Sequence, residues 1–259
     1  LIIAGSLGYS GACILSANSA ISSGAGLVKI IAPLSLKYIY ETSLIEPVIK
    51  YFDDDNLGSL RYEHVTQIID EISWADSILF GPGLGNGDNA RILKTEILKS
   101  INKPLILDAS GFESLNECDL NIIDLPKKTI LTPHYAEFSK IFKVEIKYLM
   151  NDPVSVVKNI INELDGRVLI LKGPTTIVVD STKNIYFMNH GLKGLSVAGT
   201  GDVLSGICAS AVSQGLTIDA AAIYATFLHA ECAHMYSNMI SNFGMVASDL
   251  IHMLPYAID

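Results

Sequence analysis

Short apolar runs alternate with helix-like segments along most of the chain. Most of these runs are rich in Ile, Leu and Val, and they lie at 1–5, 27–33, 46–52, 76–81, 104–109, 128–133 and 168–173. Helical patterns lie between them, near 11–24, 61–73, 88–100, 134–142 and 153–164. Buried strands that alternate with helices are typical of a mostly parallel sheet with helices on both faces. The pattern therefore predicts an α/β fold.

The pattern changes after residue 173. Segments 175–180 and 184–189 flank the turn-like sequence STKN, which predicts a small antiparallel pair at the edge of the sheet. From Asp202 onward the chain is almost entirely helical, near 203–214, 217–236 and 247–254. Because no internal repeat or linker interrupts the sequence, we expect residues 1–259 to form a single domain.

The composition excludes several classes of protein. Hydrophobic residues make up 49% of the chain, yet no apolar run approaches the roughly 18 residues that span a bilayer. The net charge of −9 argues against a nucleic-acid partner. The chain starts at Leu1 inside an apolar run, which is unlike a signal peptide, so we expect an incomplete N-terminus. The scattered cysteines favour buried free thiols in a reducing cytoplasm over a zinc site; they are Cys13, Cys118, Cys208 and Cys232.

Glycine-rich or polar sequences follow most of the predicted strands. They lie at 5–12, 81–87, 108–110, 132–137 and 172–176. Parallel strands end at one edge of the sheet, and open α/β sheets bind ligands there. We therefore expect these segments to form one functional site.

Asp202 follows Gly199, Thr200 and Gly201 where a buried helix is predicted to begin. Unpaired amides and the helix dipole make such a turn an anion site suited to phosphate. Asp202 could act only as an N-cap, but a cap does not require the two glycines. We therefore predict that Asp202 is a phosphoryl-transfer base, and that Gly199, Thr200 and Gly201 form the anion hole.

Other motifs are weaker. GSLGYSG has glycines spaced as GxxGxxG rather than GxGxxG, and no acid follows the second strand, so a Rossmann reductase is disfavoured. No GxxxxGK[ST] occurs, which excludes a P-loop NTPase. His229 and His234 are five residues apart and would not share a helix face, so with Glu231 we interpret them as packing or surface residues rather than metal ligands.

The ordered motifs GSLGYSGA, SSGAGLVKI, GPGLG, LTPHYAE, LKGPTTIV and GLKGLSVAGTGDVLSG resemble those of the NAD(P)H-hydrate dehydratases. This family belongs to the ribokinase-like superfamily and is related to carbohydrate kinases. The resemblance extends from Ile2 to Pro255. It implies that a nucleoside phosphate, ADP in the bacterial type or ATP in the eukaryotic type, phosphorylates the ring hydroxyl of hydrated NADH or NADPH. Loss of phosphate then restores NAD(P)H.

The resemblance also assigns roles to individual residues. Asp202 would activate the hydroxyl, and Glu137 would lie near Mg²⁺ and contact it through a water molecule. The hydrate would contact Ala25, Gly85, His134 and Asp202. The nucleotide would contact Lys172, Gly173, Pro174, Thr175, Thr176 and Gly201. Asp108 could cap a short turn, so we favour Asp202 over Asp108 as the catalytic base. Relatives imply a homo-oligomer and a fused or separate NAD(P)H-hydrate epimerase.

The chain departs from the family pattern at five positions around the expected pocket: Ser110, Tyr135, Ala136, Leu192 and Ala198. These departures leave nucleotide preference and efficiency open, but they retain the expected base. Two alternatives also stay open. One is a kinase for a sugar or vitamin precursor, which would use the same base and anion hole. The other is a nucleotide-binding sensor that has lost catalysis, although Asp202 argues against it.

Overall fold

The computed structural model describes residues 1–116, 119–188, 193–241 and 243–258. Within them, one nine-stranded sheet has the order β3-β2-β1-β4-β5-β6-β7-β8-β9. The strands are β1 (Ile2–Ile3), β2 (Lys29–Pro33), β3 (Val48–Phe52), β4 (Ile78–Phe80), β5 (Leu105–Leu107), β6 (Thr129–Leu131), β7 (Val168–Leu171), β8 (Thr176–Val179) and β9 (Ile185–Met188). Strands β1 to β7 are parallel, and β7, β8 and β9 pair antiparallel. Both the α/β fold and the antiparallel edge are confirmed.

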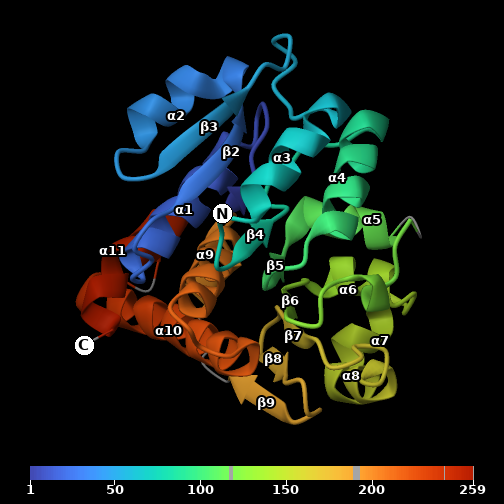
Figure 1. The fold of residues 1–259 in the computed structure, drawn as a ribbon. Coiled ribbons are helices and arrows are strands. Elements are labelled where there is room, and N and C mark those ends of the chain that lie inside the picture. The colour runs from blue at the N-terminus through green and yellow to red at the C-terminus, as the bar shows by residue number, and fades with distance from the viewer. Residues whose placement is uncertain (117–118, 189–192, 242, 259) are drawn as a thin grey trace.

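Helices cover both faces of the sheet (Figure 1). One face packs on α1 (Ser10–Ser22), α2 (Lys37–Ser43), α9 (Thr200–Ser213), α10 (Ile218–Met239) and α11 (Ala247–Ala257). The other packs on α3 (Val65–Ile72), α4 (Asp88–Ser100), α5 (Glu113–Asn116), α6 (Tyr135–Ile141), α7 (Ile146–Asn151) and α8 (Pro153–Ile160). Successive residues of a strand point to opposite faces of the sheet. Ile2 and Ile30 pack in the hydrophobic core under α1 and α9, and Ile3 and Ile31 pack in the core under α3 and α4. The pattern along the sequence did not predict α2, α5 or α7, which are short.

Strand β1 lies between β2 and β4, so the strand order reverses there. The loops that follow β1 and β4 meet at this point: Ser6 Oγ donates to the carbonyl of Gly83 at 2.8 Å, and the Gly5 amide donates to Pro82 O at 2.8 Å. Crevices at such reversal points are where open α/β sheets bind ligands.

Helix α9 packs unusually close to α1. A β-carbon on Gly206 would lie 2.0 Å from Ser19 Oγ and 2.3 Å from the Ser16 carbonyl oxygen, so only glycine allows this approach. Ser16 Oγ also donates to the backbone carbonyl of Asp202 at 3.2 Å. Helix α1 therefore fixes the amino end of α9. No helix of the described residues is long and apolar enough to cross a membrane.

Candidate active site

The amino end of α9 carries Asp202. The cap residue is Gly199, whose φ of 92° lies in the left-handed region that favours glycine and which has no side chain to cap the helix. The Thr200 hydroxyl lies 2.9 Å from Leu195 O and 3.0 Å from Val197 O, which secures the turn. Asp202 is the third helical residue, so the interpretation of Asp202 as an N-cap is wrong. The helix also starts three residues earlier than the sequence pattern suggested.

The side chain of Asp202 is partly buried. Burial, together with the nearby Asp108 carboxylate, raises the pKa of Asp202 to about 7 against the opposing effect of Lys172. A carboxyl group with this pKa is divided between its acid and base forms near neutral pH. It can therefore accept a proton from a hydroxyl, as a general base must.

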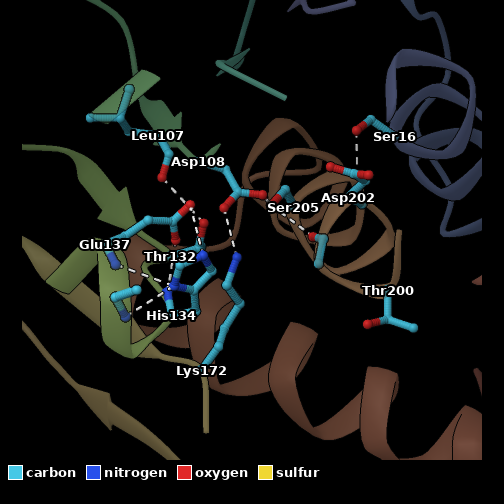
Figure 2. A network of polar contacts seen from close by, with 12 residues as sticks. Ser16, Leu107, Asp108, Thr132, His134, Glu137, Lys172, Thr200, Asp202 and Ser205 are labelled. Carbon is cyan, nitrogen blue, oxygen red and sulfur yellow. Dashed lines mark hydrogen bonds and ion pairs between the residues drawn. The ribbon is translucent and has the colours of Figure 1, made fainter. Parts of the chain in front are cut away.

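Asp108, Lys172 and Ser205 form a polar network beside Asp202 (Figure 2). Lys172 follows β7, and its Nζ lies 2.8 Å from Asp108 Oδ1 at the end of β5. Ser205 Oγ on α9 donates to Asp108 Oδ2 at 2.6 Å. Burial disfavours the Lys172 charge, but the carboxylates of Asp108 and Glu137 outweigh it, so the pKa of Lys172 is raised. Lys172 is therefore protonated, and its ammonium lies at the amino end of α9.

His134 and Glu137 form a reciprocal cap on α6. His134 Nδ1 accepts from the amides of Ala136 at 3.1 Å and Glu137 at 3.2 Å, and the His134 amide donates to Glu137 Oε2 at 2.8 Å. Because Nδ1 accepts these bonds, the ring proton is on Nε2, and His134 is a hydrogen-bond donor toward a ligand. Nε2 lies 3.5 Å from Glu137 Oε1, too far for a good hydrogen bond.

Glu137 is the acid expected near a metal ion. Burial raises its pKa, with Lys172 opposing and Asp108 adding to this effect. No group of three or more His, Cys, Asp or Glu side chains in the described part of the chain could hold a metal. Mg²⁺ needs no such cage, since it usually binds through one or two carboxylates, waters and phosphate oxygens. Glu137, with Oε1 not firmly hydrogen-bonded, fits that pattern.

A cavity of about 640 Å³ opens beside this network, between the turn after β7 and helices α9 and α10. Its lining includes most of the residues that the sequence assigned to a nucleotide: Lys172, Gly173, Pro174, Thr176 and Gly201. His134 and Thr200 also line it, whereas Thr175 does not. A volume of this order suits a ligand of nucleotide size.

Gly85 lies at the same edge of the sheet, in the loop after β4. Its φ is 79°, and a β-carbon there would approach Ser6 Oγ at 3.2 Å. Lys94 of α4, which is fully buried, donates from Nζ to the Gly85 carbonyl at 2.9 Å and pairs with Glu113. The sequence pattern did not single out Lys94, Glu113, Ser16 or Ser205, because each acts through a partner distant in sequence.

Ala25 lies at the amino ends of the parallel strands, opposite the carboxyl ends where Asp202 lies. Helix α1 starts after the carboxyl end of β1 and returns to the amino end of β2, and Ala25 lies in that return, where it lines a small cavity with Leu1 and Ser77. The chain therefore does not bring Ala25 to Asp202. Its contact with the hydrate stays a prediction.

Of the departures from the family pattern that the structure describes, only Ala198 lines the cavity. A β-carbon on Gly173 would lie 2.6 Å from the ring of Tyr135, so Tyr135 packs against the turn after β7. Ala198 is exposed at the cavity wall. Ala136 is also exposed, in the first turn of α6. Ser110 is partly buried in the short helical turn after β5. Leu192 lies outside the described residues.

His229 supports the start of α9. Its Nε2 lies 2.9 Å from the Thr200 carbonyl, to which it donates, and burial lowers the pKa of His229 to about 4. His229 is thus a neutral packing residue, which also lines the cavity. Cys13, Cys208 and Cys232 are buried free thiols, as expected, and Cys118 lies outside the described residues.

Comparison with solved structures identifies the fold. A ribokinase-like superfamily protein from Enterococcus faecalis matches with a TM-score of 0.85 at 23% identity, over 99% of this chain and 86% of that chain. The ADP/ATP-dependent NAD(P)H-hydrate dehydratase of Bacillus subtilis, co-crystallized with ATP/Mg²⁺ and soaked with CoA, matches with a TM-score of 0.80 at 24% identity, over 99% of this chain and 89% of that chain. The fold is therefore ribokinase-like.

Sequence comparison identifies the family. A family model described as NAD(P)H-hydrate dehydratase matches residues 1–256. The bifunctional NAD(P)H-hydrate repair enzyme Nnr of Dictyoglomus turgidum is 31% identical over 261 residues, covering 100% of this chain and 50% of that protein. The chain belongs to the NAD(P)H-hydrate dehydratase family. It spans about half the length of the bifunctional relatives that it matches.

Proposed function

We propose that this chain dehydrates hydrated NADH and NADPH back to the reduced cofactors at the expense of a nucleoside phosphate. The observation that carries the proposal is the position of Asp202, a carboxyl group with a pKa of about 7 at the amino end of α9, beside the Lys172 ammonium. A base and a positive charge at a helix N-terminus are what phosphoryl transfer to a hydroxyl requires.

The nucleotide would occupy the cavity beside Lys172. The backbone of Gly173 and Pro174 would face it on one side, and the amides at the start of α9 would face its terminal phosphate. ADP is the donor to test first and ATP the second. Mg²⁺, where bound, would neutralise charge on the phosphate oxygens, and Glu137 would hold it through water.

The hydrate would enter from the reversal point between β1 and β4, beside Gly85, and would extend toward His134, which follows β6. The Asp202 carboxylate would accept the proton of the ring hydroxyl while the hydroxyl oxygen bonds to the terminal phosphorus of the nucleotide. The nucleotide, shortened by one phosphate, would then leave. Breaking the carbon–oxygen bond would then release phosphate with the bonding electron pair. Loss of a proton from the adjacent ring carbon completes the double bond.

The bifunctional relatives are about twice as long as this chain. We propose that an NAD(P)H-hydrate epimerase, fused or separate, supplies the hydrate epimer that the dehydratase uses. The test is to give a mixture of the two hydrate epimers to this chain alone and then to add the epimerase, which should allow the second epimer to be converted. Conversion of both epimers by this chain alone at the same rate would exclude this division of labour.

The function is tested by following the near-ultraviolet absorbance of reduced nicotinamide. Purified protein is added to chemically hydrated NADH or NADPH with Mg²⁺ and either ADP or ATP. Recovery of absorbance that needs nucleotide and is lost in Asp202→Asn supports the dehydratase. Nucleotide binding without recovery, followed by phosphorylation of a sugar or vitamin precursor, would replace it with a small-molecule kinase. Binding with no turnover of either kind would leave a sensor.

A further inference from the structure

The carboxylate of Asp108 is the most buried charged group beside Asp202. Asp108 is 1% exposed, directly after β5, at the start of a short helical turn. Asp108 occupies the N-cap position of that turn, as the sequence suggested, but its side chain forms no capping bond there. Both of its oxygens are used elsewhere: Oδ1 by Lys172 at 2.8 Å and Oδ2 by Ser205 at 2.6 Å.

This buried ion pair is costly to the fold. Removing two charges from water is unfavourable, and an apolar pair of similar volume is often at least as stable. The two partners are also unequally buried: the Asp108 side chain is 1% exposed, whereas that of Lys172 is 21% exposed and lines the cavity. The pair therefore presents its positive member to a ligand and hides its negative member.

The position of Lys172 is restricted from several sides. Its Nζ lies 3.1 Å from the point where a β-carbon of Gly201 would be, so it sits against the first turn of α9. Ser205 lies one turn further along the same helix and donates to Asp108, which ties the carboxylate to α9 as well. The other charged or titratable groups that influence Lys172 or its partner are Glu137 of α6, Asp202 and Cys208 of α9, and His229 of α10.

We propose that Asp108 is a positioning residue: held by Ser205, it fixes the Lys172 ammonium beside Asp202, where it faces the phosphoryl group during transfer. This inference rests on the proposed function and deepens it. An ammonium held in advance stabilises charge that develops in the transition state without reorganising at that moment. Loss of the positioning group should therefore lower kcat more than it weakens nucleotide binding.

The test uses Asp108→Asn and Ser205→Ala. Asparagine retains the shape and the acceptor but removes the charge, and alanine removes only the hydroxyl that holds Asp108. The matched controls are Asp180→Asn, a buried aspartate in the turn between β8 and β9, and Ser210→Ala, a buried serine further along α9. Thermal melting of all four variants verifies the fold.

The first readout does not depend on dehydratase activity. The rate at which an amine-acylating reagent modifies Lys172 is measured against pH by mass spectrometry. Removing the facing carboxylate lowers the Lys172 pKa, so Asp108→Asn should raise the rate near neutral pH about tenfold for each unit of pKa lost. Ser205→Ala should change it in the same direction by less. ATP should shield Lys172 in the wild-type protein.

The second readout is kinetic. Asp108→Asn should lower kcat about 10- to 100-fold while the nucleotide KM changes less than about threefold, and Ser205→Ala should lower kcat by less. Labelling and kcat equal to those of the control variants would overturn the inference. If the wild-type protein does not dehydrate the hydrate but its Lys172 labelling responds to Asp108→Asn and to ATP, the proposed function fails and the positioning of Lys172 stands. If Asp108→Asn does not fold, Ser205→Ala decides.

Discussion

The Lys172 ammonium and the backbone of Gly201 are in close approach. A β-carbon on Gly201 would lie 3.1 Å from Lys172 Nζ, which is tighter than ordinary van der Waals contact. The glycine therefore makes room for a charge at the first turn of α9, where the amides have no helical partner. This arrangement gives the site both parts of a phosphate cradle: free amides and a fixed cation.

Gly201→Ala should displace Lys172 without unfolding the protein, because the clash is with the far end of a flexible side chain. We expect nucleotide affinity to fall about tenfold, which corresponds to about 1.4 kcal/mol, because the added methyl group also crowds the free amides of the first turn, which Asp108→Asn leaves intact. Isothermal titration with ATP and Mg²⁺ measures it. The control is Gly26→Ala, whose β-carbon would meet nothing within 4 Å. Unchanged affinity in Gly201→Ala would contradict the phosphate cradle.

The pH profile of the reaction should report Asp202. A base works when ionised, and the pKa of Asp202 is about 7, so kcat/KM should rise about tenfold per pH unit below pH 7 and level off above it. Asp202→Asn should lower kcat about 10²- to 10⁴-fold on the plateau above pH 7 and abolish this limb, so that the deficit shrinks as pH falls. A wild-type profile that is flat from about pH 5.5 to 8 would show that another group is the base.

Asp202 should also make stability depend on pH. Its folded pKa lies above the ordinary value of 3.8, so the folded state holds a proton that the unfolded state has lost between these values. The contribution of Asp202 to the free energy of unfolding therefore falls as pH rises from about 4 to 7. Asp202→Asn should be more stable than the wild type by about 1–3 kcal/mol near pH 8, and the gain should shrink towards pH 4. Urea denaturation at several pH values tests this; a variant less stable near pH 8 would refute it.

Much of this molecule is readable from its sequence, and the limits have physical causes. All nine strands of the described residues were expected, because the parallel strands are apolar runs between helices and the edge pair flanks a turn. The Asp202 segment could be predicted because its glycines are adjacent to Asp202 in the sequence. The hydrogen-bond network of Asp108, Lys172 and Ser205 could not be predicted, because its members come from two strand ends and a helix. Ala25 matches a family motif, but the motif could not reveal that this residue lies at the amino ends of the strands, away from Asp202.

His134 should act as a donor whose tautomer is fixed by the cap on α6. His134→Asn retains a cap acceptor and loses the Nε2 donor, whereas His134→Ala loses both. Only the alanine variant should lose about 1 kcal/mol of stability, and both should raise the KM for the hydrate. Nitrogen NMR of the imidazole should show the proton on Nε2. A wild-type KM in His134→Asn, or a proton on Nδ1, would contradict this role.

The most direct test of phosphoryl transfer to the hydrate follows one oxygen atom. The hydrate is prepared in water enriched in heavy oxygen, so that its ring hydroxyl carries the label, and is then converted in ordinary water with Mg²⁺ and ADP or ATP. If Asp202 activates that hydroxyl toward phosphorus, the label leaves with phosphate, and mass spectrometry finds it in inorganic phosphate in equal amount to the NAD(P)H formed. Label released only as water, with none in phosphate, would mean direct dehydration and would contradict the mechanism proposed for this site.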